Sequence, residues 1–158
     1  MLSSNLSEYM FSVPFLTLSW LMPFFSAVVI LFSINPQQGF SHTAKKIGLL
    51  TSLTTLGLTI IMLLKFDSNG GFQFEEQLIW FTDMDISYYL GVNGISLILI
   101  AFVSFVFPIC ILYSWNNVSR NGKEFIAFAL LLEASVIGAL SSLDLLLFYL
   151  FTEVAVLA

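Results

Sequence analysis

The sequence predicts an all-α integral membrane protein, a multi-span helix bundle of about five transmembrane helices with the last one incomplete. Of the 158 residues, 58% are hydrophobic and 9% are charged, and the mean hydropathy is +0.96. Soluble domains carry about 25% charged residues, so this chain cannot cover a water-facing surface. High hydrophobicity also excludes a disordered chain. The net charge of −5 argues against a nucleic-acid partner.

Five apolar stretches account for this prediction, because a spanning helix requires about 20 mostly apolar residues. The first, 14–34, carries no charge, and the second, 47–64, is rich in Thr but also uncharged. The third, 90–115, is a long apolar run, whereas 125–140 and 145–158 each contain one glutamate. Turn-forming sequences separate the stretches. We therefore treat residues 1–158 as a single transmembrane domain.

The last stretch is too short to cross a bilayer. At 1.5 Å per residue it reaches about 21 Å, whereas the hydrocarbon core is roughly 30 Å thick. We therefore expect the chain to be a fragment of a longer protein, with further helices following residue 158.

The charges predict an orientation in the lipid bilayer. Segment 66–89 carries five acidic residues and no basic one. Four of the five basic residues fall in the two loops that alternate with it: Lys45, Lys46, Arg120 and Lys123. By the positive-inside rule, these two loops face the cytoplasm, matrix or stroma. The N-terminus and segment 66–89, predicted as an external loop, then face the opposite side.

Two carboxyl groups, those of Glu133 and Glu153, lie inside predicted spans. Each is eight residues from the start of its span, about 12 Å deep from opposite faces, so their depths differ by about 6 Å. The two helices are joined by a tight turn, which makes them antiparallel neighbours. The carboxyls could then exchange a proton through one or two water molecules. Alternatively, each is a neutral, hydrogen-bonded acid that only packs the bundle.

Other polar and small residues favour structural roles. The sequence Ser141–Asp144 has the S-x-x-D pattern of a helix cap. Small residues spaced four apart, such as Gly138, allow another helix to approach closely. Cys110 lies alone in an apolar run, and no span contains the His pair or Cys cluster required for haem or an iron–sulfur centre. We therefore expect no cofactor and no metal on this chain.

Four sequence strings resemble one known family. YLGVNGIS begins at Tyr89, LYSW at Leu112, LLEA at Leu131, and LDLLLFY at Leu143, followed by Glu153. In this order they resemble the N-terminal part of membrane subunit 4, or chain M, of the proton-pumping NADH:quinone oxidoreductase (respiratory complex I), an antiporter-like subunit family. The resemblance covers the chain from about residue 80 to its end.

The resemblance implies a non-redox subunit that is not catalytic alone. It would couple proton pumping to the transfer of electrons from NADH to quinone. Glu153 matches the glutamate that the family pairs with a lysine on a later helix, and Glu133 matches a second family glutamate. NADH, flavin, iron–sulfur clusters and quinone belong to the parent complex. Its other membrane subunits and the missing C-terminal helices are the implied partners. The implied location is a bacterial inner, mitochondrial inner or plastid thylakoid membrane.

Two other interpretations remain open on the sequence alone. The chain could be a subunit of a multisubunit sodium/proton antiporter, since those subunits share much of the same pattern. It could also be an inert structural membrane module in which both glutamates stay neutral.

The predicted orientation can be tested with single cysteines. We expect Gln73→Cys and Asn121→Cys to react with a membrane-impermeant thiol reagent from opposite sides of the membrane, because they lie in loops of opposite charge. The parent chain, whose Cys110 lies in an apolar run, gives the background. Labelling of both positions from one side would overturn the orientation.

Overall fold

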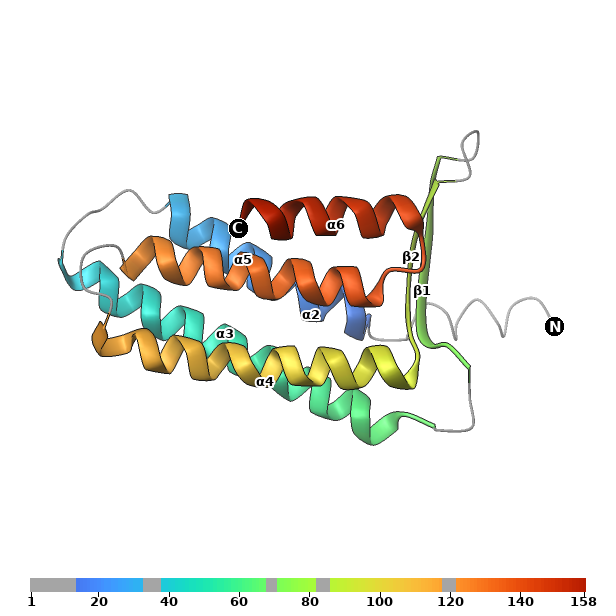
Figure 1. Cartoon of the computed structure of the whole chain (residues 1–158), viewed down its shortest axis with the longest axis horizontal. Helices are drawn as coiled ribbons and strands as arrows, with labels where there is room; N and C mark the ends of the chain where they lie inside the picture. Colours follow the sequence, from blue (N-terminus) through green and yellow to red (C-terminus); the bar gives the residue numbers. More distant parts are fainter. Residues whose placement is uncertain (1–13, 33–37, 68–70, 82–85, 118–121) are drawn as a thin grey trace.

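The computed structural model describes residues 14–32, 38–67, 71–81, 86–117 and 122–158. Successive helices run in alternating directions along one long axis, and a two-stranded hairpin lies across one end, the hairpin end (Figure 1). The elements are α2 Phe15–Phe32, α3 Gln38–Lys65, β1 Gln73–Phe81, β2 Ile86–Val92, α4 Gly94–Asn117, α5 Gly122–Ser141 and α6 Leu145–Leu157.

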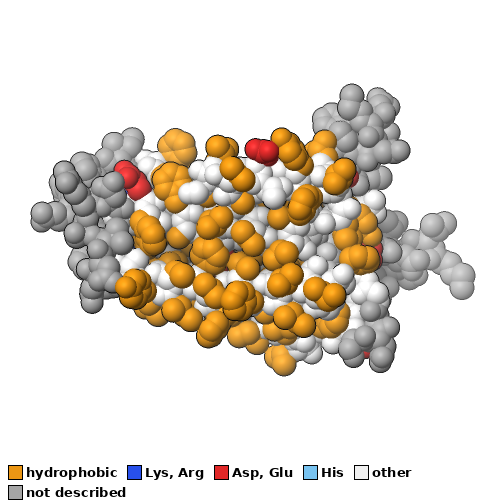
Figure 2. Space-filling view, in the orientation of Figure 1, with side chains coloured by type: hydrophobic (Ala, Val, Ile, Leu, Met, Phe, Trp, Pro, Cys, Tyr) orange, Lys and Arg blue, Asp and Glu red, His pale blue; other side chains and the backbone are white. Residues whose placement is uncertain are grey.

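The predicted class, a multi-span helical membrane bundle, is confirmed. Four of the described helices are long and apolar enough to cross a membrane, and α6 is a shorter apolar helix. α2 packs against α3 and α5, α4 packs against the same two helices, and α6 packs on α5. Hydrophobic side chains cover the middle of the face shown in Figure 2, as expected for a surface that contacts lipid tails.

The hairpin corrects the prediction for segment 66–92. Strands β1 and β2 pair antiparallel, with Gln77 opposite Tyr89. The third span therefore begins at Gly94 rather than at residue 90, and the Asn93 side chain caps it by accepting a hydrogen bond from Ser96 N at 2.8 Å. Hydropathy alone missed the strand because a short apolar run is compatible with a helix or a strand.

The hairpin caps the first turn of α2. The Glu76 carboxylate accepts hydrogen bonds from the backbone N–H groups of Leu16 at 2.8 Å and Thr17 at 3.0 Å, and from the Thr17 hydroxyl. Tyr88 joins this cluster, since its hydroxyl lies 2.7 Å from Thr17 Oγ1 and accepts from Trp20 Nε1 at 3.0 Å. Burial raises the pKa of the Tyr88 hydroxyl, which keeps it a neutral hydrogen-bonding group.

The same hairpin also holds the turn between α5 and α6. Leu143 N donates to Tyr89 O at 2.9 Å, and Leu90 forms a bridge with Ser142. Gly91 allows this approach, because a Cβ there would lie 2.6 Å from Leu143 Cδ1. Strand β2 thus fixes where α6 begins.

Asp144 caps α6 as predicted. Its carboxylate accepts from Leu146 N at 2.8 Å and from Leu147 N at 3.4 Å. Ser141 does not take part in this cap. It is the last residue of α5, and its hydroxyl donates to Ile137 O. The predicted close approach at Gly138 is confirmed, since a Cβ there would collide with the Phe151 ring.

Three of the four basic residues expected on one side of the membrane lie at the end of the bundle opposite the hairpin, which we call the lysine end. Lys45 and Lys46 are near the start of α3, and Lys123 is near the start of α5. Lys123 Nζ donates to Leu31 O at 3.1 Å, satisfying a carbonyl in the last turn of α2. Arg120 lies outside the described residues.

We expect Glu76→Ala to lower the free energy of unfolding by about 1–2 kcal/mol, because two N–H groups of α2 lose their cap. Thermal unfolding of the chain in detergent micelles, followed by tryptophan fluorescence, measures the change. Gln77→Ala, an exposed neighbour on β1, is the matched control. Equal destabilisation by both substitutions would contradict the capping role.

Candidate functional site

Glu133 is the buried carboxyl of the helical bundle. It lies on α5 with 0% of its surface exposed, and Ser52 Oγ of α3 donates to its Oε1 at 3.1 Å. Its Oε2 has no hydrogen-bond partner among the described residues. An ionised carboxylate in such surroundings is costly, so a buried intramembrane carboxyl is a functional candidate by default.

Other polar side chains continue from Ser52 along α3. Thr55 and Thr59 follow it at helical spacing on the same buried face, and Thr59 Oγ1 lies 3.1 Å from Ser104 Oγ of α4. We call Ser52, Thr55, Thr59, Ser104 and Glu133 the polar seam. The lipid-facing side of α3 is instead apolar, with exposed side chains that include Leu50, Leu53, Ile60 and Leu64.

The threonines of the second span are evident in the sequence, but this arrangement was not predicted from it. The available signal was their spacing: Ser52, Thr55 and Thr59 are separated by three and four residues, which places them on one helix face. The spacing does not show what this face contacts. In the structure, α5 packs on it and places Glu133 beside Ser52.

Glu153 has different surroundings. It is exposed on the surface of α6, and the Tyr149 hydroxyl, one turn earlier, is near its carboxylate. The opposite side of α6 packs on the bundle through Leu147 and Phe151, and the Phe151 ring lies 5.0 Å from that of Trp20. Glu153 therefore faces away from the described helices.

The structure makes α5 and α6 neighbours but does not join the two predicted site residues directly. Glu133 hydrogen-bonds to α3, whereas Glu153 lies on the outer surface of α6. No hydrogen bond connects the two carboxyls in the part of the chain that the structure describes. Proton exchange between them through water remains a prediction.

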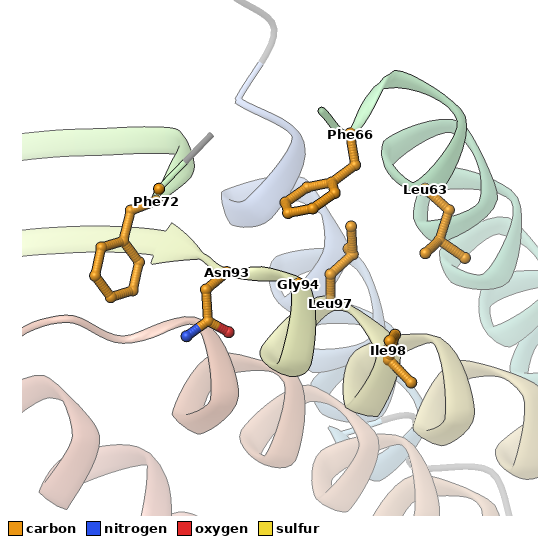
Figure 3. A pocket seen from close by; sticks show the side chains of 8 residues that line it. Leu63, Phe66, Phe72, Asn93, Gly94, Leu97 and Ile98 are labelled. Atoms are coloured by element: carbon orange, nitrogen blue, oxygen red, sulfur yellow. The ribbon is translucent and has the colours of Figure 1, made fainter. Parts of the chain in front are cut away.

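The cavity at the hairpin end is not the site of this chemistry. It measures about 490 Å³ and lies between the end of α3, the start of the hairpin and the start of α4 (Figure 3). Its lining includes Leu63, Phe66, Phe72 and Leu97 and contains no acidic or basic side chain. The one side-chain amide in the lining, that of Asn93, already caps α4.

Metal-ligating side chains do not gather within the described ranges. No group of three or more His, Cys, Asp or Glu residues is close enough there to hold a metal ion. Cys110 is exposed on α4 and forms no disulfide in the structure.

Comparison with known proteins gives the family. No protein-family profile matches the chain. NADH-ubiquinone oxidoreductase chain 4 of Arabidopsis thaliana is 38% identical over 134 residues, which are 84% of this chain and 26% of the relative. NADH-quinone oxidoreductase subunit M of Rickettsia prowazekii is 33% identical over 145 residues, which are 91% of this chain and 30% of the relative.

A third relative carries a different name. F(420)H(2) dehydrogenase subunit M of Methanosarcina mazei is 35% identical over 142 residues, which are 89% of this chain and 28% of the relative. The chain thus spans less than a third of the length of the relatives it matches. Its apolar helices and these homologues identify an integral membrane protein. The chain belongs to the family of NADH-quinone oxidoreductase subunit M and NADH-ubiquinone oxidoreductase chain 4.

Proposed function

We propose that this chain is part of a proton-translocating membrane subunit of an NADH:quinone oxidoreductase. The observation that carries the proposal is the presence of two carboxyl groups in neighbouring apolar helices of a chain from this family. Intramembrane carboxyls are typical of proton relays, because they can take up and release a proton where water is excluded.

The names of the relatives support a role in translocation rather than in electron transfer. One relative is a subunit of an F(420)H(2) dehydrogenase, and others are subunits of NADH-quinone oxidoreductases. Complexes with different electron donors therefore contain this kind of subunit. A subunit that translocates ions can work in complexes with either electron donor. A subunit that binds the donor would be specific for one kind of complex.

We infer that redox chemistry belongs to other subunits of the parent complex. NADH, flavin, iron–sulfur clusters and quinone are assigned to those subunits, and this chain contributes its two carboxyls. The partners are then the other membrane subunits of the complex, and the location is the energy-coupling membrane that holds it. The word subunit in the relatives' names supports such an assembly.

Glu153 is proposed to work with the rest of its own subunit. It lies on an exposed face of α6, and the relatives contain more than twice as much chain as is present here. A lysine supplied by that additional chain would stabilise the ionised carboxylate, and its withdrawal would favour protonation. Such a pair alternates between binding and releasing a proton without any cofactor.

We expect Glu153→Gln in the assembled complex to reduce proton pumping about tenfold or more, because it keeps the shape but removes the titratable proton. Glu153→Asp should retain part of the activity, since a carboxyl remains. Glu133→Gln should be milder, because water or other polar groups can bypass a lateral relay. Quinone-reductase rate and proton uptake, measured at matched complex abundance, report the effects.

Glu124→Gln, which neutralises an exposed carboxylate in the first turn of α5, is the matched control and should pump normally. An inert structural role gives the reverse pattern. A neutral packing acid tolerates Gln and suffers more from Asp, which leaves a void and misplaces hydrogen bonds. Pumping at the wild-type rate by Glu153→Gln would exclude the proposed role of this residue.

A further inference from the structure

The hydroxyl groups of α3 differ in the direction of their hydrogen bonds. Thr55 Oγ1 donates to Thr51 O at 3.1 Å, and Thr59 Oγ1 donates to Thr55 O at 2.9 Å. Their hydrogens are thus used within the helix, and Ser104 is the donor in its contact with Thr59. Thr55 and Thr59 can therefore only accept hydrogen bonds from other groups in the polar seam.

Ser52 is the exception in this row. Its hydroxyl hydrogen crosses from α3 to Oε1 of Glu133 on α5. While Ser52 donates to Oε1, the proton of a neutral Glu133 carboxyl is favoured on Oε2, because the carbonyl oxygen is the better acceptor. Oε2 is the atom that lacks a partner among the described residues. The Ser52 contact therefore favours Oε2 as the oxygen of Glu133 that exchanges the proton.

Apolar clusters lie on both sides of the polar seam. Toward the lysine end, the buried cluster comprises Ala27, Ile30, Ala44, Ile111, Ile126, Ala127 and Leu130. Toward the hairpin end, a second cluster contains Met62, Leu97, Ile100 and Ile137, together with residues of the hairpin. Glu133 lies between these two apolar clusters, and among the described residues the only hydrogen-bond partner of its carboxyl is Ser52.

We propose that the polar seam is an occluded proton-binding site of the translocation machinery, with Ser52 as the positioning residue of Glu133. This inference rests on the proposed function and adds a site to it. Oε2 gains a proton from a neighbouring water molecule and releases it again from the same oxygen. Ser52 keeps its own hydrogen throughout, and no oxidant or cofactor takes part.

The test uses variants of Ser52 in the assembled complex. Ser52→Ala removes the donor, and Ser52→Cys replaces it with a weak one of similar size. Thr54→Ala is the matched control, because Thr54 is exposed on the same helix and its hydroxyl donates only to Leu50 O. The readouts are the infrared C=O band of the protonated Glu133 carboxyl, identified by its loss in Glu133→Gln, and the rate of proton pumping.

We expect Ser52→Ala to move the Glu133 band to higher frequency and to slow pumping about three- to tenfold, the factor that corresponds to one hydrogen bond. Thr54→Ala should leave both properties unchanged. If Ser52→Ala does not assemble, Ser52→Cys serves instead, because a thiol of similar size is only a weak donor. It should shift the band in the same direction.

Three results would overturn the inference. They are the absence of any carboxyl band that Glu133→Gln removes, an unshifted band in Ser52→Ala, and a shifted band with unchanged pumping. If these occur while Glu153→Gln still stops pumping, the proposed function stands and only the polar seam loses its role. Unchanged pumping in both glutamine variants would instead contradict the proposed function itself.

Discussion

The hydrocarbon core of a membrane offers no water to a polar group, and the packing of this bundle depends on that constraint. Polar side chains on a spanning helix must meet other polar groups inside the protein. On α3, Ser52, Thr55 and Thr59 are buried against the neighbouring helices, whereas side chains such as Leu53, Ile60 and Leu64 are exposed. The hydrogen bond from Ser52 to Glu133 joins this buried face to α5.

At the end of the bundle, the hairpin supplies hydrogen-bond partners to backbone groups of α2. The first N–H groups of α2 have no partner within the helix, and Glu76 supplies one from a strand about 60 residues away. Strand β2 then fixes the turn before α6 through Tyr89 and Leu143. The direction of α6, and with it the position of Glu153, thus depends on a segment that lies outside the membrane-spanning helices.

The carboxyls of Glu133 and Glu153 differ in the contacts that this chain gives them. Glu133 finds a partner within this chain and is enclosed between two apolar clusters. Glu153 faces outward from α6, in a chain that spans less than a third of its relatives' length. In the proposed mechanism, the position of the Glu133 carboxyl is fixed by contacts within this chain. The protonation of Glu153 depends instead on a lysine supplied by the remainder of the subunit.

The sequence alone determined the membrane class, the two carboxyls, the cap at Asp144 and the close approach at Gly138, because each depends on local composition or spacing. It did not determine the hairpin, since an apolar run such as that of β2 fits a strand or a helix. The polar seam was also hidden. A hydropathy average includes the side chains on all faces of a helix, so it does not show which face is buried. The packing of α5 against α3 buries the face that carries Ser52 and brings Ser52 into contact with Glu133.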